Sequence, residues 1–218
     1  MNTLTHRPRL ALLAVLAIWC LLAVACSEDT EYKQSFSFPV KANMEAASYV
    51  DSSGTEVMVT VGETASTDLT SAPLVFNVAV DMATPNPDLK AAADAGELES
   101  MTVDQILFTV NTNTSTVATQ PIDLYLVPAG VTTLPEDRGG DGDDTPVLIG
   151  TIPPIAAGEM GSGQVALYPE NFIAAEKHVF DLMFNVISET GLSVASGEPV
   201  PGGELDVTVD VNMTIATQ

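Results

Sequence analysis

Apolar and polar residues alternate with a period of two along most of the chain beyond residue 34, the pattern of β-strands that bury one face. The alternation is longest near the C-terminus, where every second residue from Leu205 to Ile215 is apolar and the intervening residues are Asp, Thr or Asn. The same pattern predicts strands at 74–81 and 180–186. Shorter segments predict strands at 36–40, 57–61, 106–110, 122–127, 147–152 and 165–168, giving about nine in all.

Two segments interrupt this pattern and predict short helices. In the first, Asn86 can cap a helix that has Pro87 in its first turn and Gly96 at its end. Segment 169–176 predicts one more helical turn. Because most strands follow one another without a helix between them, the sequence favours an all-β fold, specifically an antiparallel two-sheet β-sandwich of immunoglobulin-like or related topology with one or two short connecting helices.

Residues 1–25 have the features of a secretory signal peptide. Arg7 and Arg9 precede an uncharged apolar stretch from Leu10 to Ala25, which is shorter than the roughly 20 residues that span a bilayer. The stretch ends in Leu22-Ala23-Val24-Ala25-Cys26. This segment resembles the lipobox of bacterial lipoproteins, although that family most often has leucine at the position of Ala23.

The resemblance implies that a peptidase cleaves before Cys26, that its sulfur receives a diacylglycerol and that its amine is acylated. Ser27 follows the cysteine in place of the aspartate associated with inner-membrane retention, so we expect an outer-membrane lipoprotein on the periplasmic or cell-surface side. Residues 26–34 then form an acidic tether and 35–218 a single β-sandwich domain. The alternatives are an ordinary signal peptide cut nearby and an uncleaved N-terminal anchor.

The charge balance excludes one large class of partner. The chain has 29 acidic and seven basic residues among 218, a formal net charge of −22. A polyanion would therefore be repelled, and we expect no binding to nucleic acid. Two cysteines and two histidines are too few for a zinc ribbon, a disulfide framework or a multi-histidine metal centre.

One acidic loop is a weak candidate for calcium. Asp137, Asp141, Asp143 and Asp144 lie among glycines that would let the backbone fold around a cation preferring oxygen ligands. The spacing lacks the pattern of a calcium-binding EF-hand loop. We therefore expect a solvated acidic loop and no cofactor, with calcium as the alternative.

No set of residues predicts catalysis. The segment 158–163 contains glycines and Ser162 but matches neither a nucleophile elbow nor a phosphate loop, so it predicts a turn. His178 is the only histidine outside the signal segment, and we expect it at the start or edge of a strand. Tyr125 and Tyr168 fall in the outward register of their strands, where they could form an exposed patch.

These observations favour a lipid-anchored, non-catalytic binding or assembly module that contacts another envelope protein or a surface. The alternatives are a passive structural or spacer lipoprotein and a carboxylate- or calcium-dependent envelope hydrolase. A deep pocket with converging polar groups would favour the enzyme. An exposed apolar strip or an unpaired edge strand would favour the binding module.

Overall fold

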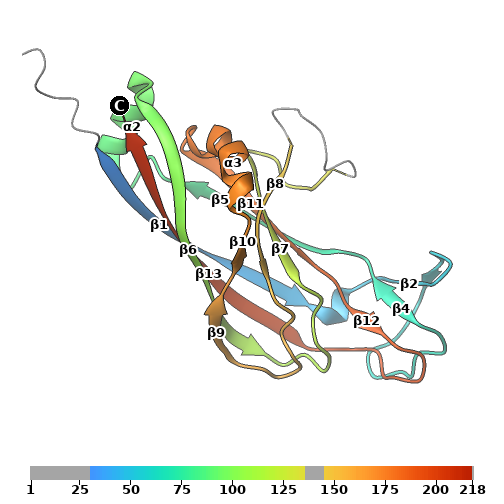
Figure 1. The fold of residues 1–218 in the computed structure, drawn as a ribbon. Coiled ribbons are helices and arrows are strands. Elements are labelled where there is room, and N and C mark those ends of the chain that lie inside the picture. Colours follow the sequence, from blue (N-terminus) through green and yellow to red (C-terminus); the bar gives the residue numbers. More distant parts are fainter. Residues whose placement is uncertain (1–29, 136–144, 218) are drawn as a thin grey trace, which may run out of the picture.

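The computed structural model describes residues 30–135 and 145–217, and these form an antiparallel β-sandwich with a third, smaller sheet at one end (Figure 1). The sequence prediction of an all-β sandwich is therefore confirmed. The first sheet has the strand order β1 (Glu31–Asn43), β13 (Glu204–Thr217), β6 (Leu98–Asn113) and β9 (Gly161–Gln164). The second has the order β10 (Ala166–Leu167), β8 (Val147–Ile152), β7 (Ile122–Pro128), β11 (Met183–Thr190) and β5 (Leu74–Asp81).

The first sheet is built around β13, which pairs with β1 on one side and β6 on the other. Its inward residues from Leu205 to Ile215 are all buried, as the alternating pattern predicted. β1 uses the same alternation and begins at Glu31, earlier than the predicted domain start at residue 35. The first residues of β1 are mostly polar, so the alternating pattern did not predict this part of the strand.

The third sheet continues one edge of the second. It has the order β12 (Ser193–Val194), β4 (Leu69–Ser71), β2 (Tyr49–Asp51) and β3 (Glu56–Val57), and a short 3-10 helix, η1 (Met44–Ala46), leads from β1 into it. β4 precedes β5 and β12 follows β11, so the β5–β11 pair extends as a ribbon into this sheet. Phe38, Tyr49, Leu69 and Val186 belong to one hydrophobic cluster that joins all three sheets.

Helix α2 (Pro87–Ala95) forms as predicted. The Asn86 side chain accepts a hydrogen bond from the Leu89 amide at 3.0 Å, and Gly96 ends the helix in the left-handed conformation. The second helical region is longer than the single turn predicted. A 3-10 turn, η2 (Pro169–Asn171), leads into α3 (Phe172–Val179), which packs against β6, β7 and β8.

Two predicted strands are wrong in part. In the predicted strand 57–61, Val57 pairs with a neighbouring strand, together with Glu56 just before it, and the segment 58–61 is not part of a strand. The Met58 side chain is 99% exposed. Segment 180–186 predicted one strand, but Phe180 caps α3 and Leu182 has a positive φ of 58°. The first apolar residues of this segment therefore belong to the turn between α3 and β11, and β11 begins only at Met183.

The open side of the sandwich has two edge strands with different protection. At the two ends of β1, the Thr217 amide of β13 donates to the Thr30 carbonyl at 3.1 Å, and the Met44 amide donates to the carbonyl of Gly203, just before β13, at 3.0 Å. The backbone N–H and C=O groups of even-numbered β1 residues therefore point toward β13, and those of odd-numbered residues point toward the free edge. The odd positions include Pro39, which lacks an N–H, and two lysines, Lys33 and Lys41. These residues disfavour pairing with another strand.

β5 has no such protection. Met82 donates to Leu182 at 2.9 Å, so the odd-numbered residues of β5 face its free edge. Val75, Asn77, Ala79 and Asp81 occupy these positions and all four are exposed, so a charged residue stands only at the last position of this edge. Neither proline nor lysine occurs within this strand. β5 therefore offers an unguarded edge among the described residues.

Replacing Val209 with Asp tests the inward register of β13. Val209 is fully buried, so the variant would place an unpaired carboxylate in the core and lower the free energy of unfolding by more than about 4 kcal/mol. The control is Asn212→Asp, which adds the same charge to an outward position of the same strand and should cost less than about 1 kcal/mol. Urea unfolding measures both, and equal losses would contradict the register.

Replacing Gly203 with Ala tests a close backbone approach. A Cβ at Gly203 would lie 2.2 Å from the Thr114 carbonyl oxygen, at a φ of +93°. Gly54 has a similar φ of +80° but open space around it, so Gly54→Ala isolates the cost of φ, about 1–2 kcal/mol. Gly203→Ala should cost about 1–3 kcal/mol more. Thermal unfolding that ranks the two variants equally would show that Thr114 yields without cost.

Candidate functional site

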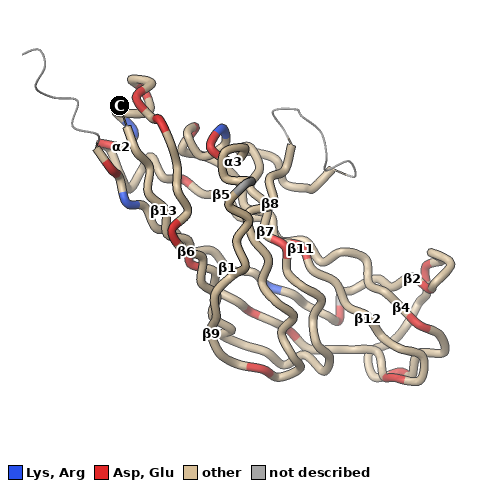
Figure 2. Tube along the Cα trace, in the orientation of Figure 1, with Lys and Arg blue, Asp and Glu red and all other residues tan. Residues whose placement is uncertain are grey.

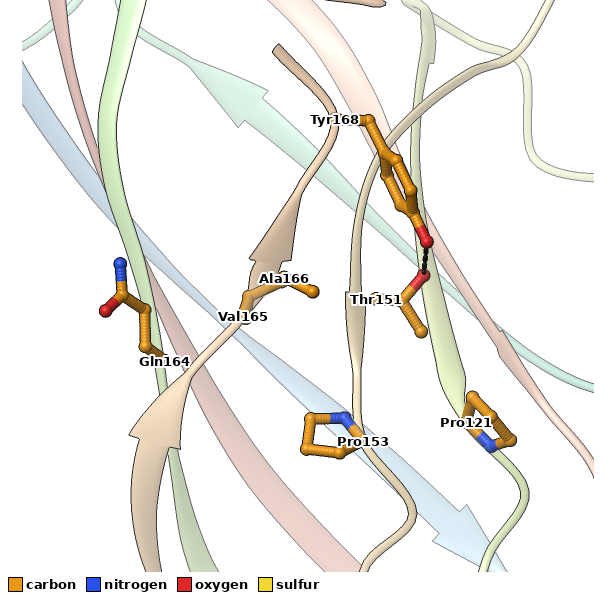
Figure 3. A pocket seen from close by; sticks show the side chains of 7 residues that line it. All are labelled: Pro121, Thr151, Pro153, Gln164, Val165, Ala166 and Tyr168. Carbon is orange, nitrogen blue, oxygen red and sulfur yellow. Dashed lines mark hydrogen bonds between the residues drawn. The ribbon is translucent and has the colours of Figure 1, made fainter.

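A surface groove of about 470 Å³ lies where the chain crosses from the first sheet to the second. Its lining, shown in Figure 3, consists of Pro121, Thr151, Pro153, Gln164, Val165, Ala166 and Tyr168. We call it the Tyr168 groove. One side is formed by lining residues of the β9–β10 segment and by Tyr168 just after it. The other is formed by Thr151 of β8, by Pro153 just after β8 and by Pro121 just before β7.

The crossing depends on close packing at Val165. The Val165 amide donates to the Ile106 carbonyl at 2.9 Å, and its side chain is buried between the sheets. Gly150 allows this approach, because a Cβ there would lie 2.6 Å from Val165 Cγ1 and 3.0 Å from the Ala166 carbonyl oxygen. Gly163 likewise leaves room for the ring of Phe108, because a Cβ at Gly163 would lie 2.8 Å from that ring. Small residues at these positions therefore bring β9 and β10 close enough to form the groove wall.

A short chain of polar groups runs along the second-sheet side of the groove. Thr151 Oγ1 donates to Asp123 Oδ1 at 2.7 Å and lies 3.2 Å from the Tyr168 hydroxyl (Figure 3). A carboxylate only accepts hydrogen bonds, so the single hydroxyl hydrogen of Thr151 goes to Asp123. The Tyr168 hydroxyl must then donate to Thr151. Its remaining capacity, like that of Asp123, is for accepting hydrogen bonds.

The two tyrosines singled out from the sequence differ in their surroundings. Tyr168 is half-buried and lines the groove. The outward register of Tyr125 allowed either an exposed patch or a half-buried strand residue, but Tyr125 is buried more deeply than both: it is 7% exposed and packs with Val127 and Ile187 in a small second hydrophobic cluster. Further apolar residues from 131–134 cover this outer face, which the alternation of β7 alone did not reveal.

His178 also differs from its prediction. It lies in the last turn of α3 and is 3% exposed, with its Nε2 atom 3.2 Å from the Thr145 carbonyl oxygen. Segment 158–163 does contain a turn, in which Gly158 has a positive φ, but Gly161, Ser162 and Gly163 belong to β9. Ser162 thus lies in an edge strand.

The other predicted site residues, Cys26, Asp137, Asp141, Asp143 and Asp144, lie outside the described residues. Within 30–135 and 145–217, no group of three or more His, Cys, Asp or Glu side chains could hold a metal ion. No helix in the same part of the chain is long and apolar enough to cross a membrane.

Acidic residues are distributed over the whole fold, with few basic residues between them (Figure 2). The described part of the chain has four lysines and no arginine, and two of these lysines form ion pairs, Lys41 with Asp206 and Lys90 with Asp94. Hydrogen bonds from neutral groups stabilise other carboxylates. The Ser53 hydroxyl, above all, lowers the pKa of Asp51, and the Thr84 hydroxyl lowers the pKa of Asp81.

Comparisons with known proteins identify no family. No family model matches the chain, and no curated protein matches it. Among solved structures, a chain of Desmodium yellow mottle tymovirus aligns at 10% identity and a TM-score of 0.25, covering 100% of this chain and 95% of the viral one. A chain of turnip yellow mosaic virus aligns at 8% identity and a TM-score of 0.20, covering 85% and 95%. Both TM-scores are too low to support an argument about function.

The excess of carboxylates predicts a dependence of stability on salt. Monovalent salt screens repulsion between like charges, so NaCl should raise the melting temperature at neutral pH. If the loop of Asp137, Asp141, Asp143 and Asp144 is simply solvated, CaCl₂ at equal ionic strength should match NaCl. A further, saturable calcium shift that disappears on replacing Asp141 and Asp143 with Asn would contradict this and identify a calcium site.

Proposed function

We propose that this protein is a lipid-anchored cell-envelope protein that acts as a non-catalytic binding or assembly module. Its anchor is Cys26, the lipobox cysteine, and its membrane is the outer membrane. The observation that carries the proposal is the position of Thr30, four residues after Cys26. Thr30 accepts a hydrogen bond from the Thr217 amide at 3.1 Å, so both ends of the described chain meet at one end of the sandwich, beside α2 (Figure 1).

This arrangement supports a defined orientation for an anchored molecule. The four-residue connection from Cys26 to Thr30 spans at most about 14 Å, which keeps the α2 end close to the lipid. β1, with 13 residues, then runs about 43 Å away from that end toward the third sheet. The third sheet and the Tyr168 groove would face away from the membrane and along the flank, where a partner can reach them.

The unguarded edge of β5 is the feature that favours binding over a passive spacer. An edge strand without lysine or proline can pair with an extended segment of another protein. The exposed Val75 side chain on this strand adds apolar surface next to the free backbone groups. A spacer has no use for such an edge, and capture of an envelope protein by the full chain would distinguish the two functions.

The anchoring part of the proposal predicts that Cys26→Ala abolishes lipidation. Intact-mass analysis of wild-type membrane fractions should show a chain that begins at Cys26 and carries added acyl mass. The variant should lack that form. Cys20→Ala is the matched control, because Cys20 lies within the signal segment and its loss should leave processing unchanged. Unaltered lipidation in Cys26→Ala would refute the anchor.

The same material tests the orientation. Once Cys26 is lipidated, a cysteine introduced at Glu97 or Thr60 is the sole free thiol of the mature chain. Glu97 follows α2, whereas Thr60 lies beside the third sheet, and both are exposed. A fluorophore at residue 97 should be quenched by nitroxide-labelled lipids far more than one at residue 60. Equal quenching would show that the sandwich does not stand away from the membrane.

A further inference from the structure

We propose that the Tyr168 groove binds an organic cation, an ammonium or guanidinium group carried on an apolar stem. This inference deepens the proposed binding function and names the chemistry recognised by one of its surfaces. The group could belong to a free polyamine or to a lysine or arginine side chain of a partner protein. Both sources present the same hydrogen-bond donors and the same positive charge.

The hydrogen-bond direction in the groove is the first argument. Because Thr151 donates to Asp123 and Tyr168 donates to Thr151, the groups left on this wall can only accept. Gln164 is the lining residue with an amide donor, and its side chain extends to the opposite side of the β9–β10 segment from Thr151 (Figure 3). A group bound beside Thr151 and Tyr168 would therefore have to supply the donors, which favours a cation over a phosphate or carboxylate group.

Charge complementarity is the second argument. Asp123 lies behind the lining residue Thr151, which donates to it at 2.7 Å; it is half-buried and takes part in no ion pair within the described part of the chain. The strongly negative protein attracts cations over a longer range. An ammonium or guanidinium placed near Asp123 would gain a charge-assisted hydrogen bond.

The walls of the groove provide the third argument. Pro121, Pro153 and Ala166 present apolar surface between the strands, and the ring of Tyr168 stands beside Thr151 (Figure 3). Lysine, arginine and polyamines pack their methylene stems on such surfaces while the charged end reaches a polar group. An aromatic ring adds a cation–π attraction. The groove volume of about 470 Å³ is sufficient for one such group and its stem.

Titration of the full chain in detergent with three probes tests this assignment. The probes are spermidine, the blocked peptide acetyl-Pro-Arg-Pro-amide and the same peptide with citrulline in place of arginine. Citrulline has nearly the shape of arginine without its charge. At 150 mM NaCl, we expect spermidine and the arginine peptide to bind and the citrulline peptide to bind at least tenfold more weakly. Tighter binding of spermidine would identify a free polyamine as the source, and tighter binding of the arginine peptide a protein side chain.

Two carboxylate variants locate the binding. Asp123→Asn should weaken binding of the arginine peptide at least tenfold. Asp104→Asn is the matched control, because Asp104 accepts a hydrogen bond from Thr214 at 2.9 Å on the outer face of the first sheet, in the same kind of Thr–Asp pair. It should leave binding unchanged. Tyr168→Phe, which keeps the ring, should weaken binding less than Tyr168→Ala.

Three results would overturn the inference: no binding of any probe, equal binding of the arginine and citrulline peptides, or equal effects of Asp123→Asn and Asp104→Asn. Melting temperatures of the variants show whether each remains folded. Failure here is separable from failure of the proposed function. If Asp123→Asn remains lipidated at Cys26 and still captures the same envelope protein as wild type, only the assignment of the groove is lost.

Discussion

The pairing of β13 with two long neighbours is the constraint on which the rest of the sandwich depends. This strand has 14 residues, and every second one is buried. A shift of one residue would expose the whole inward row and bury aspartates and threonines instead. Its register with β1 is unbroken, whereas the register with β6 shifts at three places. Such irregularities increase local twist and bend the strand. β6 is thus the curved partner, and it carries β9 to the crossing at Val165.

The scarcity of basic residues has a direct structural consequence. Most carboxylates of the described chain have no lysine or arginine to pair with, and hydroxyl and amide groups take that role. Thr151 binds Asp123, Thr214 binds Asp104, and Ser37 binds Asp210. A hydrogen bond to a charged group contributes about 1.5–3 kcal/mol, roughly twice that of a neutral pair. The serines and threonines between the acidic residues therefore satisfy carboxylates as well as favouring extended backbone.

Hydrogen bonding to hydroxyl groups, in place of ion pairs, leaves the carboxylates negatively charged. A lysine partner would neutralise the local charge, but a hydroxyl donor only orients the carboxylate and lets its charge persist. Asp123 illustrates the difference, since Thr151 fixes one carboxylate oxygen and leaves the other able to accept. The composition and the acceptor character of the Tyr168 groove thus have the same origin.

The sequence pattern predicted the parts of the fold in which one local signal dominates. β13 and β8 follow from alternation, and α2 follows from its Asn86 cap, Pro87 and Gly96. Segments 57–61 and 180–182 were misassigned because apolar residues alternate there without strand partners. Partners are a tertiary property, and Val61 shows that an apolar residue in the predicted inward register can still be 44% exposed.

The alternating sequence pattern could not predict the Tyr168 groove, because the polar chain of the groove joins residues from three separate segments. Thr151 and Asp123 meet only through the pairing of β8 with β7, and Tyr168 reaches them only after the chain changes sheets at Val165. The sequence did contain two weak signals. Tyr168 was correctly placed on the outward side, and Gly150 sits within the predicted strand 147–152, where glycine often marks a close backbone approach.

The difference between the two edge strands of the open side can be interpreted in terms of the proposed lipid anchor. Lipid attachment confines copies of a protein to a surface and raises their effective concentration, so a long exposed strand edge becomes a risk of self-pairing. β1 is the longest edge and lies nearest the tether, and it is the one that has Lys33, Pro39 and Lys41 on its free side. Repulsion between the acidic domains acts in the same direction. β5 is shorter and lacks such protection, although the same repulsion would keep other copies of this chain away from it. Because this charge repulsion acts against other acidic chains, the free edge of β5 is suited to a neutral or basic partner.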